Sequence, residues 1–337
     1  MKVFWRTAVM GIGFSLVSVH GTFAETPLKE RVLVKETVVR AAREDVWTAW
    51  TTKQGLEAFL APRADIELRI GGKFEISFNP SAPEGQRGSE GCTVLSFLPL
   101  EMLSFTWNAP PTIPKLRESG ARTHVIVYLE DGGPDEIKVR LAQLGFGEGE
   151  DWEKYYAYFD RAWGSVLGAL KDQISMVAAP DKTDQVDARL QFQTLVAAPV
   201  ADVWAAFTTK EGTEQWMVPL AEIDLRVGGL WRTNYNRDGS IGDPGTIAHR
   251  IMTYEPNRLL AFQTIGAPAG FPHAEAIKGT WAVVTMTAES PEKTKVRLAS
   301  VGLGRRPAAD AMVEFFQEGN RVTLDGLTKR FEFGEKK

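Results

Sequence analysis

The chain has 337 residues, enough for two or three domains, and its 44% hydrophobic and 24% charged residues are typical of a globular protein. The formal net charge of −4 argues against a nucleic-acid-binding protein, which needs clustered basic residues to displace counterions. One cysteine, Cys92, excludes an internal disulfide, and the sequence has no Cys/His cluster with zinc-ligand spacing, so we interpret Cys92 as a thiol within a strand.

The first 24 residues have the pattern of a secretory signal peptide. Lys2 and Arg6 form a positively charged start, residues 7–19 are mainly apolar, and the Thr-Phe-Ala sequence at 22–24 is a small-x-small cleavage signal. The apolar segment is shorter than the roughly 20 residues that a membrane span needs. We therefore expect cleavage near Ala24, an exported protein (periplasmic or secreted) and no stable membrane span. An uncleaved anchor is the alternative.

The mature chain is predicted to begin with a strand and two short helices. Residues 32–40 alternate and are rich in β-branched side chains, which predicts a strand. Val46, Trp47 and Trp50 then fall on one face of a short helix. A second short helix is predicted over residues 52–60, because threonine is a favourable residue at a helix start.

Strands are predicted for most of the segment that follows. Alternating apolar residues over 66–70 indicate a strand, with Arg69 on the outer face beside Glu67. The pair Gly71-Gly72 predicts a hairpin turn, because glycine takes a positive φ without strain. Further strands are predicted over 74–78, 91–97, 102–108, 123–130 and 136–144. An antiparallel meander is the simplest connection for such short strands.

A long amphipathic helix is predicted to close this unit. From Trp152 to Leu170, apolar residues recur at three- and four-residue steps and form a broad stripe. Residues 177–188 are rich in Asp, Ala and Thr, which predicts a linker. The first domain is therefore predicted to cover residues 32–176.

The same pattern occurs a second time after the linker. Val46 and Val203 are 157 residues apart, and so are Gly71 and Gly228. A unit of this length far exceeds the roughly 20–50 residues of a solenoid repeat, so each copy is expected to be a domain with its own core. The second domain is predicted to cover residues 189–332.

The second copy contains four sequence motifs whose order along the chain is typical of a protein family. They are Ala-Pro-Val-Ala-Asp-Val-Trp at 198–204, Val-Gly-Gly at 227–229, Tyr-Glu-Pro-Asn-Arg-Leu-Leu-Ala-Phe at 254–262 and Thr-Lys-Val-Arg-Leu at 294–298. Together they resemble the START-like superfamily SRPBCC and, within it, the activator of heat shock protein 90 ATPase homologue domain family. The resemblance implies an α+β fold of two tandem START-like helix-grip domains. In each, an antiparallel meander sheet wraps around a long C-terminal helix, and two short helices follow the first strand.

The resemblance also implies a class of function. Members of the superfamily enclose an apolar cavity between the sheet and the long helix and use it for lipids, hormones and polyketides. We therefore expect a small hydrophobic ligand in one or both domains and no cofactor, and we favour a binding protein over an enzyme. A co-chaperone role needs a cytosolic chaperone, which an exported protein would not meet, so no such partner is expected.

Aromatic residues of the sheets and helices are the candidates for lining the cavity. They are Phe59, Phe105, Trp107, Tyr155, Phe159, Trp163, Trp216, Trp231, Phe262 and Phe316. The final helices differ, because Ala162-Trp163 of the first copy is replaced by Gly319-Asn320 in the second. We therefore expect the two cavities to differ in shape and polarity.

No motif of the sequence predicts a reaction. GxSxG, HExxH and Walker patterns are absent from it, so no catalytic residue and no metal ligand is predicted. Its three mature histidines, His124, His249 and His273, are isolated and are interpreted as surface or capping residues. Two alternatives stay open: a cyclase- or hydrolase-type enzyme on the same scaffold, with His124 as acid or base, and an interaction module whose aromatic residues fill its cavities.

Overall fold

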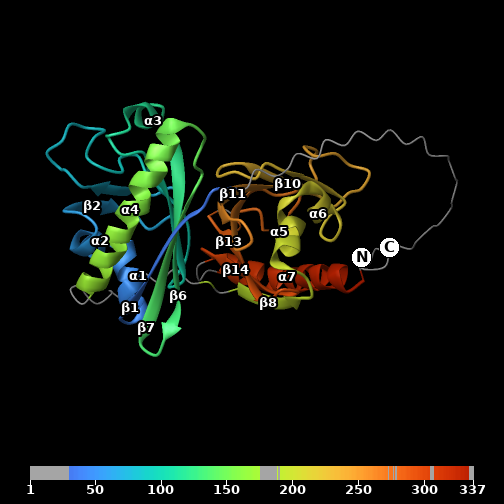
Figure 1. Ribbon diagram of the computed structural model, residues 1–337. Coiled ribbons are helices and arrows are strands. Elements are labelled where there is room, and N and C mark those ends of the chain that lie inside the picture. Colours follow the sequence, from blue (N-terminus) through green and yellow to red (C-terminus); the bar gives the residue numbers. More distant parts are fainter. Residues whose placement is uncertain are drawn as a thin grey trace, which may run out of the picture.

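The protein consists of two domains, each with an antiparallel sheet and a long final helix, as predicted (Figure 1). The computed structural model describes residues 30–174, 188, 190–271, 273–275, 277, 279–303 and 307–333. The predicted signal peptide and the predicted linker, apart from Ala188, lie outside the described residues. None of the described helices has the length and apolar character needed to cross a membrane.

The first domain runs from β1 to α4. Its elements are β1 (Leu33–Arg40), α1 (Arg43–Thr51), α2 (Lys53–Phe59), β2 (Arg63–Ile66), β3 (Phe74–Ser77), β4 (Val94–Leu98), β5 (Met102–Asn108), α3 (Pro114–Glu118), β6 (Arg122–Gly133), β7 (Glu136–Leu144) and α4 (Glu150–Gln173). The main sheet has the strand order β1-β7-β6-β5-β4, and β2 pairs with β3 separately. The long helix α4 covers one face of the main sheet (Figure 1).

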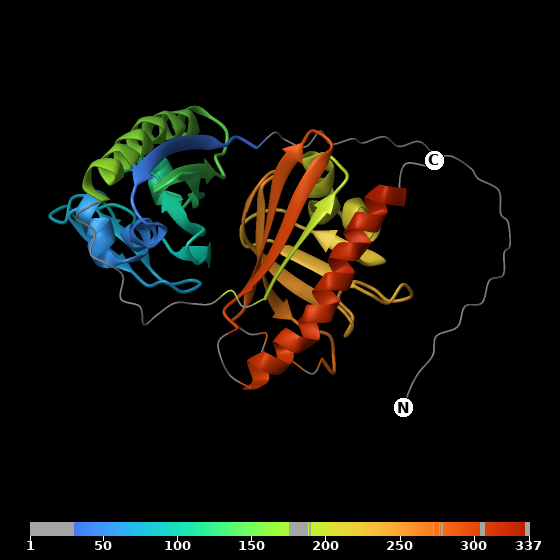
Figure 2. The ribbon, with the colours of Figure 1, turned by 90° about the horizontal axis from the view of Figure 1, so that it is seen from below.

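The second domain repeats this order of elements. They are β8 (Leu190–Val196), α5 (Val200–Thr208), α6 (Lys210–Glu214), β9 (Leu220–Ile223), β10 (Leu230–Asn234), β11 (Ile247–Glu255), β12 (Leu259–Gly266), β13 (Trp281–Ser290), β14 (Lys293–Val301) and α7 (Pro307–Phe333). One sheet with the order β8-β14-β13-β12-β11-β10-β9 contains every strand. Figure 2 shows α7 lying across this sheet.

The register of the strands keeps the sequence offset. Phe105 pairs with Val125 in the first domain, and Phe262 pairs with Ala282 at the equivalent place in the second. Each residue of the second pair lies 157 positions after the corresponding residue of the first pair. Residues of the two domains can therefore be compared position by position.

Local contacts determine where the second small helix of each domain begins and how closely the two small helices approach each other. The Thr52 side chain accepts a hydrogen bond from the Gly55 amide at 3.0 Å and so caps α2, as predicted for this threonine. A Cβ atom on Gly55 would lie 2.3 Å from the Thr48 carbonyl oxygen, so α1 and α2 can meet this closely only with glycine there. Thr209 caps α6 in the same way.

Two details of the first domain differ from the prediction. The strand expected over 66–70 is β2, which ends at Ile66, because the Arg69 amide bonds to the nearby Glu67 carbonyl and turns the chain there. The helix α3 was not predicted. The expected ion pair between Arg69 and Glu67 is present, and Gly71 has a φ of 71°, as the predicted turn requires.

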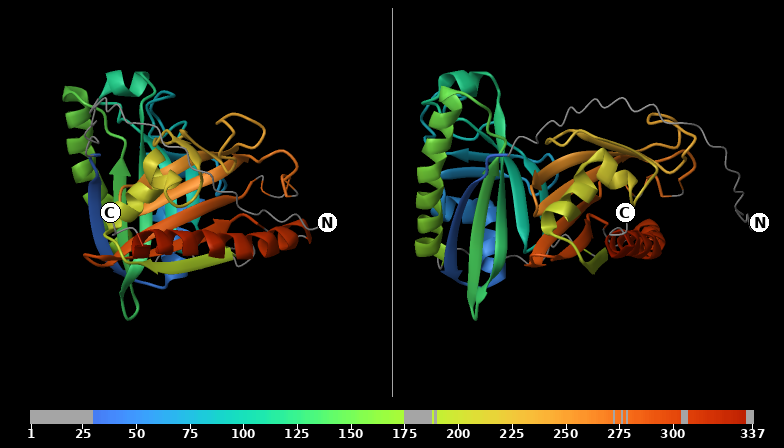
Figure 3. Two further views of the ribbon diagram at one scale, coloured as in Figure 1. Left: turned by 90° about the vertical axis from the view of Figure 1, so that its right-hand side faces the viewer. Right: turned by 45° about the vertical axis from the view of Figure 1, so that its right-hand side comes forward.

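The sheets pack against each other through the faces that point away from the long helices. Figure 3 shows α4 and α7 on opposite sides, with both sheets between them. Trp281 of β13 donates its Nε1–H to the Phe97 carbonyl of β4 at 2.8 Å, and the two rings contact each other. Leu259, Val283 and Val301 of the second domain belong to the same buried apolar cluster as the core of the first. The core of the first domain therefore continues into the facing side of the second sheet, whereas the other side of that sheet belongs to separate buried clusters.

Candidate functional site

The space between sheet and α4 in the first domain is filled by aromatic rings. Tyr155, Phe159 and Trp163 of α4 are buried and face the sheet. The ring centroids of Trp163 and Trp107 are 5.2 Å apart, and Phe159 packs on both of these rings. Phe105 lies further along β5 and stacks on a neighbouring ring of β3. These candidate residues therefore pack on one another.

A chain of hydrogen bonds fixes this packing. The Trp163 Nε1–H donates to the Gln143 side-chain oxygen at 2.7 Å, and the Gln143 amide donates to Thr123 Oγ1 at 2.8 Å. The Tyr155 hydroxyl donates to the Trp107 carbonyl at 3.1 Å. Buried polar groups are stable only when they have such partners, so α4 is held against the sheet by polar as well as apolar contacts.

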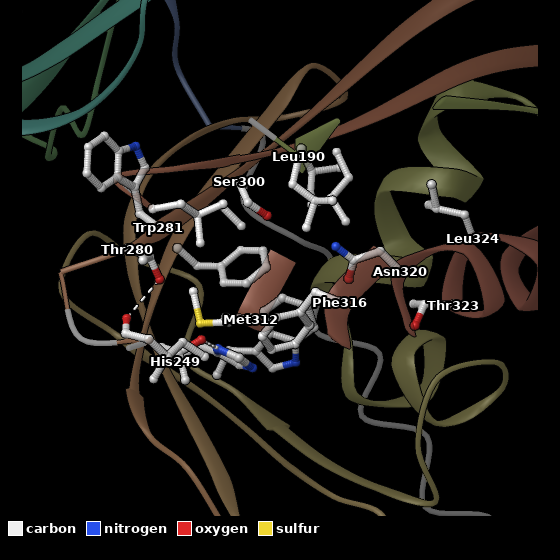
Figure 4. Close-up of a pocket in the computed structure, with 18 of the residues that line it drawn as sticks. Leu190, His249, Thr280, Trp281, Ser300, Met312, Phe316, Asn320, Thr323 and Leu324 are labelled. Carbon is white, nitrogen blue, oxygen red and sulfur yellow. Dashed lines mark hydrogen bonds between the residues drawn. The ribbon is translucent and has the colours of Figure 1, made fainter. Parts of the chain in front are cut away.

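Smaller side chains occupy the equivalent positions of the second domain. Trp107, Gln143, Tyr155 and Trp163 correspond to Thr264, Ser300, Met312 and Asn320. The loss of two indole rings leaves space between α7 and the sheet. A cavity of about 190 Å³ lies there, lined by Thr264, Ser300, Met312 and Asn320 and by other residues of β8, α5, β10 to β14, α7 and the loops between them (Figure 4).

The cavity wall is mostly apolar, with a few polar groups. Figure 4 shows Asn320 and Ser300 on one side of the cavity, and Met312 and His249 on the other. The indole Nε1–H of Trp231, a buried lining residue, has no hydrogen-bond partner among the described residues. The cavity therefore combines a mostly apolar wall with an amide and several hydroxyl groups.

His249 is an uncharged part of this wall. Its Nδ1 forms a hydrogen bond with Thr264 Oγ1 at 3.0 Å, and its ring packs against Trp231 and Phe262. Burial lowers the pKa of His249 to about 4, so the imidazole is neutral at pH 7. No Asp, Glu, Lys or Arg is among the described residues that line the cavity.

A comparison with protein families identifies the chain. The family described as Activator of Hsp90 ATPase homolog 1-like protein matches residues 40–174 and 197–332, one match in each domain. The chain belongs to this family. The match confirms the resemblance predicted from the sequence motifs.

Solved structures similar to this family member include a dimer and a di-domain protein. The Aha1 dimer from Colwellia psychrerythraea is 18% identical to this protein. The match covers 44% of this chain and 98% of the Aha1 chain, with a TM-score of 0.35. The di-domain ARO/CYC BexL from the BE-7585A biosynthetic pathway is 17% identical to this protein. The match covers 90% of this chain and 99% of the BexL chain, with a TM-score of 0.32. No curated protein matches the chain.

The ten candidate residues of this family member fall into three groups. Trp231, Phe262 and Phe316 line the cavity of the second domain. Trp107, Phe159 and Trp163 border a different cavity, on the outer side of the first domain's aromatic packing. The other four candidates, which line neither cavity, are Phe59, Phe105, Tyr155 and Trp216.

Sequence reasoning missed the polar residues of the second-domain cavity, among them Thr264, Ser300, Asn320 and His249. The signal for the first three was the 157-residue offset, because each replaces a large residue of the first copy. His249 is the counterpart of Cys92, which is buried just before β4, close to the strand position expected for it. We interpreted His249 as a surface or capping residue, whereas it lies in the cavity wall.

The remaining chemically interesting groups lie outside both cavities. His124 is buried between the domains, where its Nε2–H donates to the Tyr254 carbonyl at 3.0 Å. Burial raises the pKa of the Cys92 thiol to about 11, which makes it unreactive at pH 7. Within the described part of the chain, no group of three or more His, Cys, Asp or Glu side chains could hold a metal ion.

Proposed function

We propose that this protein binds a small, uncharged and largely apolar molecule in the cavity of its second domain, between the sheet and α7. One observation carries the proposal. Trp107 and Trp163, which fill this space in the first domain, are exchanged for Thr264 and Asn320 in the second. The fold is the same in both copies, so these exchanges create the space for a ligand.

The size of the cavity limits the ligand. An apolar cavity of about 150 Å³ in another protein holds benzene, and this one has about 190 Å³. That is less than the roughly 300–1,000 Å³ of sites for drug-sized molecules. A single ring or a short acyl chain therefore fits, and a long lipid chain does not fit inside.

The chemistry of the wall limits the ligand further. An unpaired charge would lose its hydration in a site lined by apolar and neutral groups, which costs several kcal/mol. The Asn320 amide and the Ser300 hydroxyl offer hydrogen-bond donors. The ligand should therefore be neutral and carry an acceptor such as a carbonyl or hydroxyl oxygen.

The same groups favour binding over catalysis. General acid–base catalysis works best with a pKa near the operating pH, whereas burial lowers the pKa of His249 to about 4. A second titratable acid or base is missing from the described lining residues. The enzymatic alternative also invoked His124, which the domain interface holds away from the cavity.

A cavity-filling variant tests the proposal. We expect p-cresol, a single ring with one hydroxyl, to bind the full chain in isothermal titration calorimetry with a Kd of about 1 mM. About seven buried carbons contribute about 6 kcal/mol at about 0.8 each, before the cost of association. Asn320→Trp should abolish this binding, because it restores the indole of the first copy. Val322→Trp, on an exposed position of the same helix, is the matched control.

Two outcomes would contradict the binding proposal. One is the lack of saturable binding in the parent, and the other is parent-like binding by a folded Asn320→Trp variant. Thermal melts establish that the variant is folded. If it is not, Thr264→Trp places the other missing indole in the same space from β12 and gives the same test.

We also propose that the protein is exported, with the signal peptide removed near Ala24. The support is the charged start, the apolar segment and the cleavage signal of the first 24 residues. Intact-mass measurement of the protein from its native cells should give a chain that begins at Glu25. Recovery of the full-length chain from the cytosol would contradict export.

A further inference from the structure

A second cavity lies in the first domain, outside the packed rings between sheet and α4. Its volume is about 420 Å³, within the range of small-molecule sites. Three segments form its sides: the loop over residues 78–88 after β3, residues 108–112 after β5, and the flank of α4. The side chains of Trp107 and Trp163 contribute to its inner wall.

The sides of this cavity are held in place by one buried arginine. Arg117 of α3 donates hydrogen bonds to the carbonyl oxygens of Gly88 at 2.8 Å and Ala109 at 2.5 Å. It also forms an ion pair with Glu90 at 2.6 Å, and its side chain is only 10% exposed. Both loops are thus fixed to the same guanidinium. A ligand would enter a preformed site and would lose little free energy to ordering of the loops.

Two aromatic residues at this cavity remain open to solvent. Phe78 is 47% exposed and Tyr158 is 40% exposed, although both are large apolar side chains. Phe78 touches Trp107 edge to face, with the ring centroids 6.5 Å apart. Aromatic rings prefer edge-to-face or offset-stacked neighbours, so a planar ligand finds matching surfaces here.

One positive charge borders the same cavity. Arg87 is the single charged side chain among the described residues that line it. Its Nε–H donates to the Ala82 carbonyl at 2.9 Å, which anchors the side chain, and it forms no ion pair with a described carboxylate. The terminal N–H groups of a guanidinium match the two oxygens of a carboxylate. Pro244 stands at the equivalent position of the second domain, so this charge is particular to the first.

We infer that this cavity is a binding site for a small aromatic anion. The ring lies among Phe78, Tyr158 and the inner indoles, and the anionic group lies at Arg87. The inference does not rest on the proposed function, because the second-domain cavity is uncharged and lies in the other domain. The two sites differ in the charge of the ligand that each accepts.

Two probes of the same shape test the charge. Naphthalene-2-carboxylate should bind the full chain saturably in calorimetry, and 2-naphthalenemethanol should bind more weakly. Arg87→Gln should weaken binding of the carboxylate about three- to tenfold, as the loss of one charge-assisted contact near the surface does, and change binding of the alcohol less than about twofold. Arg161→Gln removes an exposed positive charge of α4 that does not line the cavity, and it should leave both affinities unchanged.

A second pair of variants tests the location. Ala162→Trp should fill the cavity from α4 and abolish binding of the carboxylate, whereas Ser165→Trp, at an exposed position of the same helix, should not. Asn320→Trp, which closes the second-domain cavity, should leave carboxylate binding intact. This variant separates a failure of the present inference from a failure of the proposed function.

Three results would overturn the inference. They are the absence of saturable carboxylate binding, an equal effect of Arg87→Gln on both probes, and loss of binding in Asn320→Trp but not in Ala162→Trp. The third result would place the probe in the second-domain cavity. Arg87 is exposed, so its substitution tests the charge even if Ala162→Trp does not fold.

Discussion

Arg140 of β7 and Glu255 of β11 join the two domains through a buried ion pair with two hydrogen bonds. The guanidinium nitrogens lie 2.8 and 2.5 Å from the two carboxylate oxygens, and the side chains are 11% and 7% exposed. The Tyr128 hydroxyl donates a third hydrogen bond to Glu255 at 2.7 Å. A carboxylate of the second domain is thus surrounded by donors of the first, in place of water.

Removal of Glu255 should strongly destabilise the whole protein. Glu255→Ala leaves the buried Arg140 with only the more distant Glu36 carboxylate, 3.7 Å from its Nε, and leaves the Tyr128 hydroxyl without its acceptor, which costs about 3–5 kcal/mol in the free energy of unfolding. Urea denaturation followed by tryptophan fluorescence measures this. The control is Glu318→Ala, which breaks an exposed ion pair on α7 and should leave stability unchanged within error. A similarly small effect of both substitutions would contradict the burial of the interface pair.

The two domains should stay together after the chain between them is cut. A protease site placed within residues 177–188, the predicted linker, should give two fragments that co-elute in size-exclusion chromatography. The reason is the core that continues from the first domain into the second, in which Trp281 packs against Phe97. Fragments that elute separately as folded monomers would show that the interface contributes little to stability.

Equivalent substitutions should have unequal costs in the two long helices. Trp163→Ala removes a buried ring and leaves the Gln143 oxygen without its donor, so it should cost about 3–5 kcal/mol. Asn320→Ala changes a half-buried residue beside an existing cavity and should cost less than about 1 kcal/mol. Urea denaturation of both variants measures the difference. Equal costs would contradict the different packing of α4 and α7.

Stability should fall between pH 7 and pH 5 because two histidines are buried in their neutral form. Burial lowers the pKa of both His124 and His249 to about 4, whereas the pKa in the unfolded chain is about 6.5. The stabilisation is complete above pH 6.5 and is lost as the pH falls towards 4, because the unfolded chain then binds more protons. At pH 5 the contribution of each histidine to the free energy of unfolding should be smaller by about 2 kcal/mol.

The His249→Phe variant isolates one of these contributions. Urea denaturation at pH 7.5 and pH 5.0 should show a smaller loss of stability for this variant than for the parent, by about 2 kcal/mol. Titrating carboxylates act equally in both proteins and cancel in the comparison. An unchanged difference between the two pH values would show that His249 does not stay neutral in the folded state.

The sequence by itself determined most of the elements, their order and the family, although not the short helix α3. These properties rest on local patterns: strand alternation, helical spacing and turns that need glycine. Gly71 and Gly228 have φ values of 71° and 81°, as the predicted hairpin turns require. The strand expected over 66–70 ends at Ile66 in the structure. An alternating pattern of apolar residues does not reveal the turn that follows, which is closed by a hydrogen bond from the Arg69 amide to the Glu67 carbonyl.

Only the tertiary structure decided which sheet face meets which neighbour. The residues of β6 from Thr123 to Leu129 are all buried, since α4 covers one face and the second domain covers the other. Because both faces of this strand are buried, the hydrophobicity of its residues does not show to which face each side chain belongs. His124 could therefore be placed in a cavity from the sequence, whereas it lies in the interface with Tyr254.

The cavities too were decided by the tertiary structure. The sequence showed that Trp163 is replaced by Asn320, but an empty space also requires that Trp107, 56 positions earlier in the first copy, be replaced by a small residue. A cavity exists only where no segment supplies the missing volume, and the segments concerned are far apart along the chain. Local patterns set the fold of each domain, and the sum of side-chain volumes decided that the space between sheet and long helix is filled by rings in the first domain and holds a cavity in the second.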